Sequence, residues 1–366
     1  MRRRLLLTTD AVGGVWTYSL DLARALAQAE DMVILLAVLG PVPTADQLAE
    51  AAAVPGLQLI ETGLPLDWLA GSEADVRDAA WSLAELAAES GADLAQLHTP
   101  ALATCPYPAP VVSVVHSCVA TWWQAVGHGP LPADLAWRAT LVGEGLERSD
   151  QVVAPTRAFA RAVQGAYRLS ALPRSVHNGR STLFRALREE APEEAALTAG
   201  RLWDAGKNVA TFDRAAALSS LPFRAAGPLA GPGGERVVLA HAEPLGSLAA
   251  RDLVEALSRR PIFVSAALYE PFGLAVLEAA QAGCALVLAD RPGFRELWNE
   301  AALFVDPLDE HGIAAAVDRL AADPATRAAL GHAALERSAT FTPAATAQAM
   351  LDLYAALAPT SHKVAA

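Results

Sequence analysis

The sequence predicts an α/β protein built from two Rossmann-like, doubly wound domains that face each other across a cleft. Three observations support this fold class. The chain has 366 residues, more than one ordinary hydrophobic core accommodates. Short apolar runs alternate with longer helical patterns, and this alternation occurs twice along the chain. Hydrophobic residues make up 53% of the chain and charged residues 19%, which is typical of a globular protein.

The first series of apolar runs has the length and composition of buried strands. Helical periodicity separates several of them, as in Tyr18–Gln28, Val76–Glu89 and Ala136–Arg148. Strands that alternate with helices in this way form parallel sheets covered on both faces. The predicted strands are Leu5–Thr9, Val33–Leu39, Leu57–Glu61, Leu94–Leu97, Val111–Val115 and Gln151–Ala154.

The same alternation then starts again and predicts a second sheet. Helices are expected at Ala249–Ser258 and Leu274–Ala282. The break between the two series falls near His177-Asn178-Gly179, which the charged segment Arg185–Glu194 follows, so we expect domains at residues 1–178 and 179–343. The predicted strands of the second domain are Ala196–Ala199, Arg236–Ala240, Ile262–Ala266, Ala285–Leu288 and Leu303–Val305.

Charge and composition exclude several classes of protein. A formal net charge of −12 argues against a nucleic-acid-binding surface. No apolar run approaches the roughly 20 residues that span a bilayer, and the run Leu5–Leu7 is too short for a signal peptide, so we expect a cytoplasmic protein. Three cysteines without C-x-x-C spacing predict buried thiols and neither disulfides nor a zinc site.

One local group of positive charges is an exception to the acidic character. It could contact an anionic acceptor or a membrane surface, although solvated helix charge is the more common explanation for such a group. Its members are Arg157, Arg161, Arg168 and Arg174.

The strongest functional signal is the segment from Ser265 to Gly283, in which a strand ends, a loop carries Glu270, and a helix begins. The free N–H groups of the first helical turn, at Gly273 and Leu274, form an anion site through backbone geometry and the helix dipole. Gly273 also allows a ligand oxygen to approach the main chain closely. In parallel sheets, ligands bind beyond the carboxyl ends of the strands, where this loop lies.

Glu278 is the only charged residue between Pro271 and Ala289. A lone carboxylate in so apolar a helix requires a partner. The two hydroxyl groups of a ribose would supply one, and capping by a neighbouring backbone group or an arginine would supply another. The sequence pattern leaves both interpretations open.

Arg201 and Lys207 lie on the loop after the first strand of the second domain. Two cations six positions apart can bracket a diphosphate, since arginine offers a fork of donors and lysine a point charge. The signal is weak alone and gains weight because the loop shares an edge of the sheet with Glu270 and Gly273.

The first domain contributes weaker signals. Gly13 and Gly14 open a helix after the first strand, which allows close approach of a ligand but is also consistent with a tight turn. The surrounding residues are not the G-x-G-x-x-G dinucleotide motif. His98 and His116 each follow a predicted strand, where a histidine is either functional or a structural residue with satisfied hydrogen bonds. Asp10 lies just before the glycine pair.

Common catalytic motifs are missing. The sequence has no H-E-x-x-H, no G-x-S-x-G, no P-loop and no Asp-x-Asp metal clamp after a strand. Metalloprotease, esterase, P-loop NTPase and metal-dependent sugar transferase functions therefore lose their usual support, and no metal ligand or cofactor is expected.

With seven residues between Glu270 and Glu278, the run Tyr-Glu-Pro-Phe-Gly-Leu-Ala-Val-Leu-Glu-Ala resembles the signature of the retaining family 4 glycosyltransferases, which have the GT-B fold of two Rossmann-like domains. Other segments resemble the family in the same order and cover nearly the whole chain. The ending Phe341–Leu357 resembles the family's last helix, which crosses back onto the first domain, so residues from about 344 to 366 would join that domain. The further segments are Gly13-Gly14, His116, Val153–Thr156, His177–Gly179, Gly200-Arg201 with Lys207-Asn208, and Gly283–Val287.

The resemblance implies roles for individual residues. Glu278 would hold the donor ribose, and Arg201 with Lys207 would hold the diphosphate. Glu270 and the backbone of Phe272, Gly273 and Leu274 would contact the donor sugar and its distal phosphate. Gly14 would lie against a phosphate or the acceptor, and His116 near the hydroxymethyl end of the sugar. On this reading Glu270, His116, Arg201 and Lys207 form the catalytic set.

This chain departs from the family pattern at two places. A proline is usual in the run that is Gly283-Cys284-Ala285-Leu286-Val287 here, which is a conservative packing change. The usual Asn-Gly-Val-Asp is Asn178-Gly179-Arg180-Ser181, so a role inferred for that loop from the family is in doubt.

The function implied is transfer of a sugar, with retention and without a metal, from a nucleoside-diphosphate sugar to a hydroxyl acceptor. The nucleotide sugar is a co-substrate, so no cofactor is implied. The sequence does not identify the sugar, the base or the acceptor, for which Thr121-Trp122-Trp123-Gln124 could supply aromatic contacts or simply fill the core. The alternatives are a sugar-nucleotide epimerase or a phosphorylase of the same architecture, or a non-catalytic sugar-nucleotide-binding protein.

Overall fold

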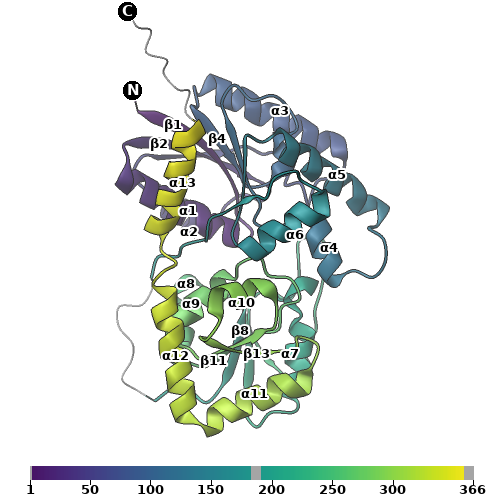
Figure 1. Cartoon of the computed structure of the whole chain (residues 1–366), viewed down its shortest axis with the longest axis vertical. Coiled ribbons are helices and arrows are strands. Elements are labelled where there is room, and N and C mark those ends of the chain that lie inside the picture. Colours follow the sequence, from purple (N-terminus) through teal and green to yellow (C-terminus); the bar gives the residue numbers. More distant parts are fainter. Residues whose placement is uncertain (1, 183–190, 358–366) are drawn as a thin grey trace, which may run out of the picture.

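The computed structural model of the protein describes residues 2–182 and 191–357, which form two α/β domains, one above the other in Figure 1. Each domain contains one fully parallel sheet with helices on its faces, so the predicted fold class is confirmed. Most of the charged segment Arg185–Glu194 lies outside the described residues, as does the part of the predicted last helix after Leu357.

The first domain has a seven-stranded sheet in the order β3-β2-β1-β4-β5-β6-β7. In its centre, Leu5 lies beside Ile34 on one neighbouring strand and beside Leu94 on the other. Its elements are β1 (Arg3–Asp10), α1 (Gly14–Ala29), β2 (Met32–Leu39), α2 (Ala45–Ala52), β3 (Leu57–Glu61), α3 (Glu73–Glu89), β4 (Leu94–Leu97), the 3-10 helix η1 (Pro100–Ala103), β5 (Val111–Val114), α4 (Val119–Val126), α5 (Ala133–Arg148), β6 (Gln151–Ala154), α6 (Arg157–Tyr167) and β7 (Arg174–Ser175).

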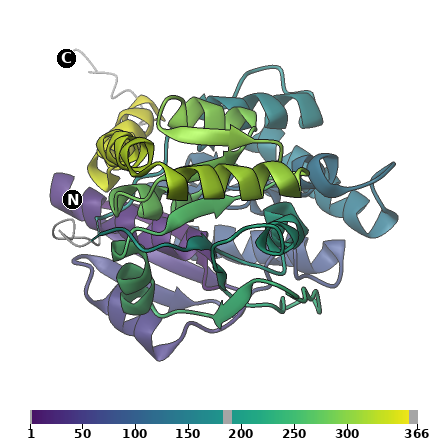
Figure 2. The same cartoon turned by 90° about the horizontal axis from the view of Figure 1, so that it is seen from below.

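The second domain has a six-stranded sheet in the order β10-β9-β8-β11-β12-β13. Seen from below, α11 lies across the base of this domain (Figure 2). Its elements are β8 (Ala196–Ala199), the 3-10 helix η2 (Ala205–Lys207), α7 (Val209–Ala216), β9 (Phe223–Ala226), β10 (Glu243–Gly246), α8 (Ala250–Ser258), β11 (Ile262–Ser265), α9 (Leu274–Gln281), β12 (Leu286–Ala289), α10 (Pro292–Trp298), β13 (Ala302–Val305), α11 (Glu310–Ala322) and α12 (Pro324–Ser338), and α13 (Pro343–Leu357) follows them.

Each sheet is buried on both faces because its strands are apolar throughout. On β1, Leu5 and Leu7 pack toward α1 and α13, whereas Leu6 packs on the opposite face with α3, α5 and α6. In the second sheet, Phe263 packs with α9 and α10, and its neighbour Val264 packs with α7 and α11. Alternate residues of one strand therefore serve two separate cores.

The predicted strand at Arg236–Ala240 is wrong. This segment contains only an isolated bridge from Arg236 to Ala230, and Val238 is 84% exposed. The carboxylate of Asp213 accepts hydrogen bonds from the backbone N–H groups at the end of the segment, beginning with Ala240, so they are not available to a neighbouring strand. The sheet instead uses β9 and β10, which lie on either side of this segment in the sequence.

Helix α13 lies on the first domain although it follows the whole second domain in the sequence (Figure 1). Met350 and Tyr354 are fully buried in the core shared with α1. The return crossing runs beside the outward one, because the Arg180 backbone N–H donates to the Phe341 carbonyl. Gly179 is required there, since a Cβ would lie 2.1 Å from the Thr342 backbone.

Strand order reverses at one point in each sheet, between β1 and β4 in the first and between β8 and β11 in the second. Parallel α/β sheets bind ligands outside the carboxyl ends of the strands at such a switch point. The loop after β1 contains Gly13, the loop after β8 contains Arg201, and the loop after β11 contains Glu270. The fold therefore brings the predicted site residues of both domains to the carboxyl edges of the two sheets.

Candidate active site

A cavity of about 280 Å³ lies between the domains at these edges. We call it the interdomain cavity. Asp10, Asp67 and His116 line it from the first domain, and Arg201 and Trp203 line it from the second. Its volume is close to the lower end of the range of small-ligand pockets, roughly 300–1,000 Å³.

The Gly13-Gly14 loop lies directly against the second domain. A Cβ on Gly13 would be 3.6 Å from the Arg201 guanidinium, and one on Gly14 would be only 3.1 Å from the Leu274 side chain. Gly14 thus permits a close approach between the start of α1 and the start of α9. The two predicted glycines lie beside predicted donor-binding residues of the other domain.

Arg201 and Lys207 lie on the same side of the cleft, each beside a carboxylate. Arg201 donates to Asp204 Oδ2 at 3.1 Å, and its guanidinium lies 5.7 Å from the centre of the Trp203 ring. Lys207 Nζ donates a hydrogen bond to Glu270 Oε2. The ion pair joins two residues predicted separately from sequence, one on η2 and one on the loop before α9.

The start of α9 has the backbone geometry expected of an anion site. Gly273 adopts a φ of +91°, which residues other than glycine rarely adopt. A Cβ there would lie 3.2 Å from Phe294. The Phe272 side chain is buried against Phe341, so only its backbone could face a ligand. Leu274 is the first residue of the helix, where main-chain N–H groups have no intrahelical acceptor.

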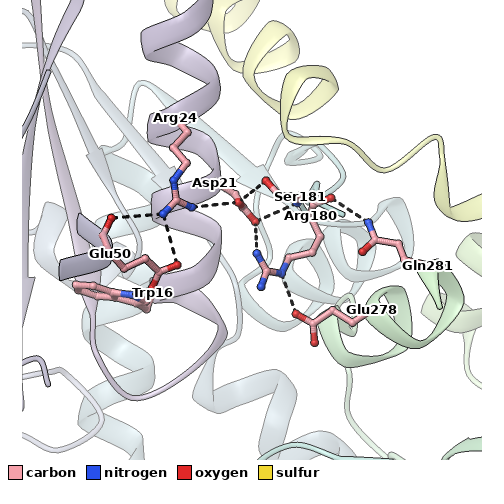
Figure 3. A network of polar contacts seen from close by, with 8 residues as sticks. All are labelled: Trp16, Asp21, Arg24, Glu50, Arg180, Ser181, Glu278 and Gln281. Carbon is pink, nitrogen blue, oxygen red and sulfur yellow. Dashed lines mark hydrogen bonds and ion pairs between the residues drawn. The ribbon is translucent and has the colours of Figure 1, made fainter. Parts of the chain in front are cut away.

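Glu278 has a partner that the sequence left undecided. Arg180 Nε donates to Glu278 Oε1 at 2.8 Å, and another nitrogen of the same guanidinium lies 2.8 Å from Asp21 Oδ2 (Figure 3). Burial alone would lower the pKa of Arg180, but the two carboxylates raise it overall, so the guanidinium stays charged. A ribose role for Glu278 stays a prediction, with one of its oxygens already bound to arginine.

This ion pair belongs to a longer polar network that connects α1 with α9 (Figure 3). Ser181 donates to Asp21 Oδ1 through its hydroxyl at 2.7 Å, and Gln281 donates to the Arg180 carbonyl at 3.0 Å. On the other side, Arg24 lies 3.6 Å from Asp21. Arg180 and Asp21 were not predicted as site residues from the sequence, although the change from the family pattern at Arg180 was a signal.

His116 and His98 lie side by side, with ring centres 4.8 Å apart. Burial lowers the pKa of His116 to about 4. Burial also lowers the pKa of His98 well below its usual value, so both rings are neutral at pH 7. His98 contacts Ser19 Oγ through Nδ1 and Gln96 through Nε2. The buried Nε2 of His116, by contrast, has no hydrogen-bond partner within the described parts of the chain.

Two further contacts across the cleft were not predicted as site features. The Tyr269 hydroxyl accepts a hydrogen bond from the Cys118 backbone N–H at 3.0 Å. Trp122 Nε1 donates to Asp204 Oδ1 at 3.1 Å, and Trp122 lines the interdomain cavity. Trp123, its predicted companion, donates instead to the Gly129 carbonyl. The available signal for Tyr269 was its position directly before Glu270 in the sequence.

Arg157 and Arg161 lie exposed on α6, and Arg174 lies exposed on β7. Membrane contact by this group stays a prediction. Across residues 2–182 and 191–357, no helix combines the length and apolar character needed to cross a bilayer. All three cysteines are buried, as predicted.

Comparisons with known proteins agree with this fold. Residues 12–182 match the family model Glycosyltransferase Family 4, and residues 236–337 match Glycosyl transferases group 1. Alpha-maltose-1-phosphate synthase of Mycobacterium tuberculosis is 36% identical over 111 residues, which are 28% of this chain and 29% of that protein. The match thus spans less than a third of the curated relative.

Solved structures resemble nearly the whole chain. Sucrose-phosphate synthase from Thermosynechococcus elongatus has a TM-score of 0.78 at 19% identity, over 97% of this chain and 99% of its own. HepE of Anabaena, solved in complex with UDP and glucose, has a TM-score of 0.74 at 17% identity, over 98% of this chain and 100% of its own.

The fold and the paired carboxyl edges define a GT-B protein. The chain belongs to the GT-B glycosyltransferases of the family 4 and group 1 type.

Proposed function

We propose that the protein transfers a sugar from a nucleoside-diphosphate sugar to an acceptor hydroxyl, with retention of anomeric configuration and without a bound metal. The observation that carries the proposal is the convergence of two cations and a helix N-terminus at one cleft. Arg201 lies beside the Gly13 loop, and Lys207 is paired with Glu270 just before the Gly273 turn. Such a group suits a diphosphate better than a neutral ligand.

In the proposed reaction, the acceptor oxygen bonds to the anomeric carbon as the bond from that carbon to the diphosphate breaks. The electron pair of the broken bond stays on the leaving phosphate, whose growing charge Arg201, Lys207 and the N–H groups at the start of α9 would stabilise. The acceptor proton passes to a leaving phosphate oxygen. Retention follows if attack and departure occur on the same face, as the family resemblance implies.

The direct test is an assay of the full chain with a panel of nucleotide sugars. The panel is first ranked by thermal shift, because a ligand at 1,000 times its Kd stabilises by roughly 4 kcal/mol. The best donor is then incubated with acceptors in EDTA, and the product is followed by proton NMR. We expect an α-linked product from an α-linked donor. A β-linked product, dependence on added magnesium, or an epimerised donor would each contradict part of the proposal.

Two variants address the role of the cations. We expect Arg201→Ala and Lys207→Ala each to lower kcat by on the order of 10² or more, because both would stabilise charge on one leaving group. Their combined effect should be less than multiplicative for the same reason. Arg214→Ala is the matched control, because Arg214 lies on the following helix and pairs with Glu310. A comparable loss of activity in the control would contradict the specific role of Arg201 and Lys207 at the leaving diphosphate.

A further inference from the structure

The interdomain cavity adjoins the proposed diphosphate site through Arg201 and is otherwise lined mainly by the first domain. Given the proposed function, it is the place where an acceptor would bind. Four carboxyl side chains line it, from Asp10, Asp67, Asp204 and Glu235. This acidic lining limits the charge that an acceptor bound there can carry.

Among the described residues lining the cavity, the arginines are Arg138 and Arg201, and no lysine contributes. Arg138 is already engaged, because its nitrogens donate to the backbone carbonyls of Asp67, Asp134 and Ala70. Its guanidinium also lies 4.2 Å from the centre of the Trp137 ring. Arg201 is assigned to the donor diphosphate in the proposed function. The described residues of the cavity therefore offer no further uncommitted cation for a second phosphate group.

The carboxyl groups of Asp10 and Asp67 are also unsuited to binding an anion. Burial raises the pKa of Asp10, although the Val12 N–H and Arg201 oppose the shift. Burial likewise raises the pKa of Asp67, against a hydrogen bond from Thr99. The ionised form of either group would repel a phosphate, and the protonated form offers it one donor only.

The rest of the lining suits hydroxyl groups and an apolar sugar face. His116 lines the cavity, and its buried Nε2 has no hydrogen-bond partner among the described residues. The neutral ring could therefore exchange a hydrogen bond with a hydroxyl that reaches it. Trp68 and Trp203 supply large apolar surfaces on opposite domains, and Trp68 is 36% exposed. We infer that the acceptor is an uncharged, polyhydroxylated molecule such as a free sugar or glycoside, and not a sugar phosphate.

This inference rests on the proposed function, so its test first establishes donor binding. With the donor that stabilises the full chain most in a thermal shift panel, nucleotide release is measured for glucose, fructose and maltose. Glucose 6-phosphate, glucose 1-phosphate, fructose 6-phosphate and glucosamine serve as charged counterparts. If no donor or nucleoside diphosphate stabilises the protein, the proposed function itself fails.

With donor binding established, we expect kcat/KM for at least one uncharged sugar to exceed that of its charged counterparts at least tenfold. Faster use of a phosphate ester or of glucosamine would overturn the inference, and so would the absence of transfer to every uncharged sugar. Trp68→Ala should raise the acceptor KM at least tenfold and leave the donor KM unchanged. The control Trp81→Ala, at a 54% exposed position on α3 that does not line the cavity, should change neither. An unchanged acceptor KM in Trp68→Ala would remove the cavity as the acceptor site.

Discussion

Arg180 occupies the space between two carboxylates that belong to different domains. The Asp21 side chain is 2% exposed, and those of Arg180 and Glu278 are 11% exposed. Charges so poorly solvated are tolerated because each has its partner at hydrogen-bond distance. A residue that interrupts the family pattern at the crossing between domains thereby becomes part of the link between α1 and α9.

We expect Arg180→Met to lower the free energy of unfolding by about 3–5 kcal/mol, because it removes the guanidinium that neutralises two buried carboxylates and leaves Asp21 only its contacts with Ser181 and Arg24. Urea denaturation followed by tryptophan fluorescence measures this loss. The matched control is Arg24→Met, since Arg24 is 31% exposed and lies 3.6 Å from Asp21. It should cost less than about 1 kcal/mol. Equal losses in the two variants would argue against a structural role specific to Arg180.

At the scale of elements, the sequence predicted those strands whose position follows from the pattern of apolar residues alone. The strands β1, β2, β4 and β11 were visible because they are short apolar runs buried on both faces. Glu243–Gly246 was missed because its exposed residues, with a proline and a glycine, look like a turn. Arg236–Ala240 was misread because its path is determined by hydrogen bonds that Ala240 and the next residues donate to Asp213, which lies on a helix 27 residues before Ala240.

The same distinction holds for the site. The positions of Glu270, Gly273, Arg201 and Lys207 at the carboxyl edge of the sheet could be predicted because each follows a recognisable strand, whereas their roles stay predictions. The partners of these residues could not, because contacts such as Lys207 with Glu270 depend on how two loops meet. Glu278 shows most clearly what the sequence could not predict. An isolated carboxylate in an apolar helix needs a partner, but the sequence did not identify that partner as Arg180.

The start of α9 allows backbone strain to be separated from ligand binding. We expect Gly273→Ala to cost about 1–2 kcal/mol of stability, since alanine is strained at a φ of +91°. It should also weaken binding of the preferred donor's nucleoside diphosphate, because the new methyl group would displace Glu270 or Phe294 beside the proposed anion site. Gly234→Ala is the control, with a φ of +93° and open space around its Cβ. Urea denaturation should show similar stability losses in the two variants. Calorimetry should show that the control alone keeps the parent's affinity for the nucleoside diphosphate of the preferred donor.

At the scale of the whole molecule, the first domain is completed by a segment that follows the second domain in the sequence. We expect Met350→Ala in α13 to cost about 2–5 kcal/mol, because Met350 is fully buried against the first domain. Hydrogen exchange should show the loss of protection in α1 and not in β12. Gln348→Ala, at an exposed position of the same helix, should change stability by less than about 0.5 kcal/mol. Loss of protection confined to the second domain would contradict this assignment.

The position of α13 also determines the order in which the protein can be completed during synthesis. Strand β7 ends at Ser175 and α13 begins at Pro343, so the whole six-stranded sheet is translated between them. At about 5–20 residues per second, the apolar surface of α1 that α13 covers waits roughly 10 to 30 seconds for its cover. During that interval the nascent first domain exposes the side of its core that Met350 and Tyr354 later fill. A chaperone that binds apolar surface near the ribosome would therefore have its longest opportunity on the domain that is made first.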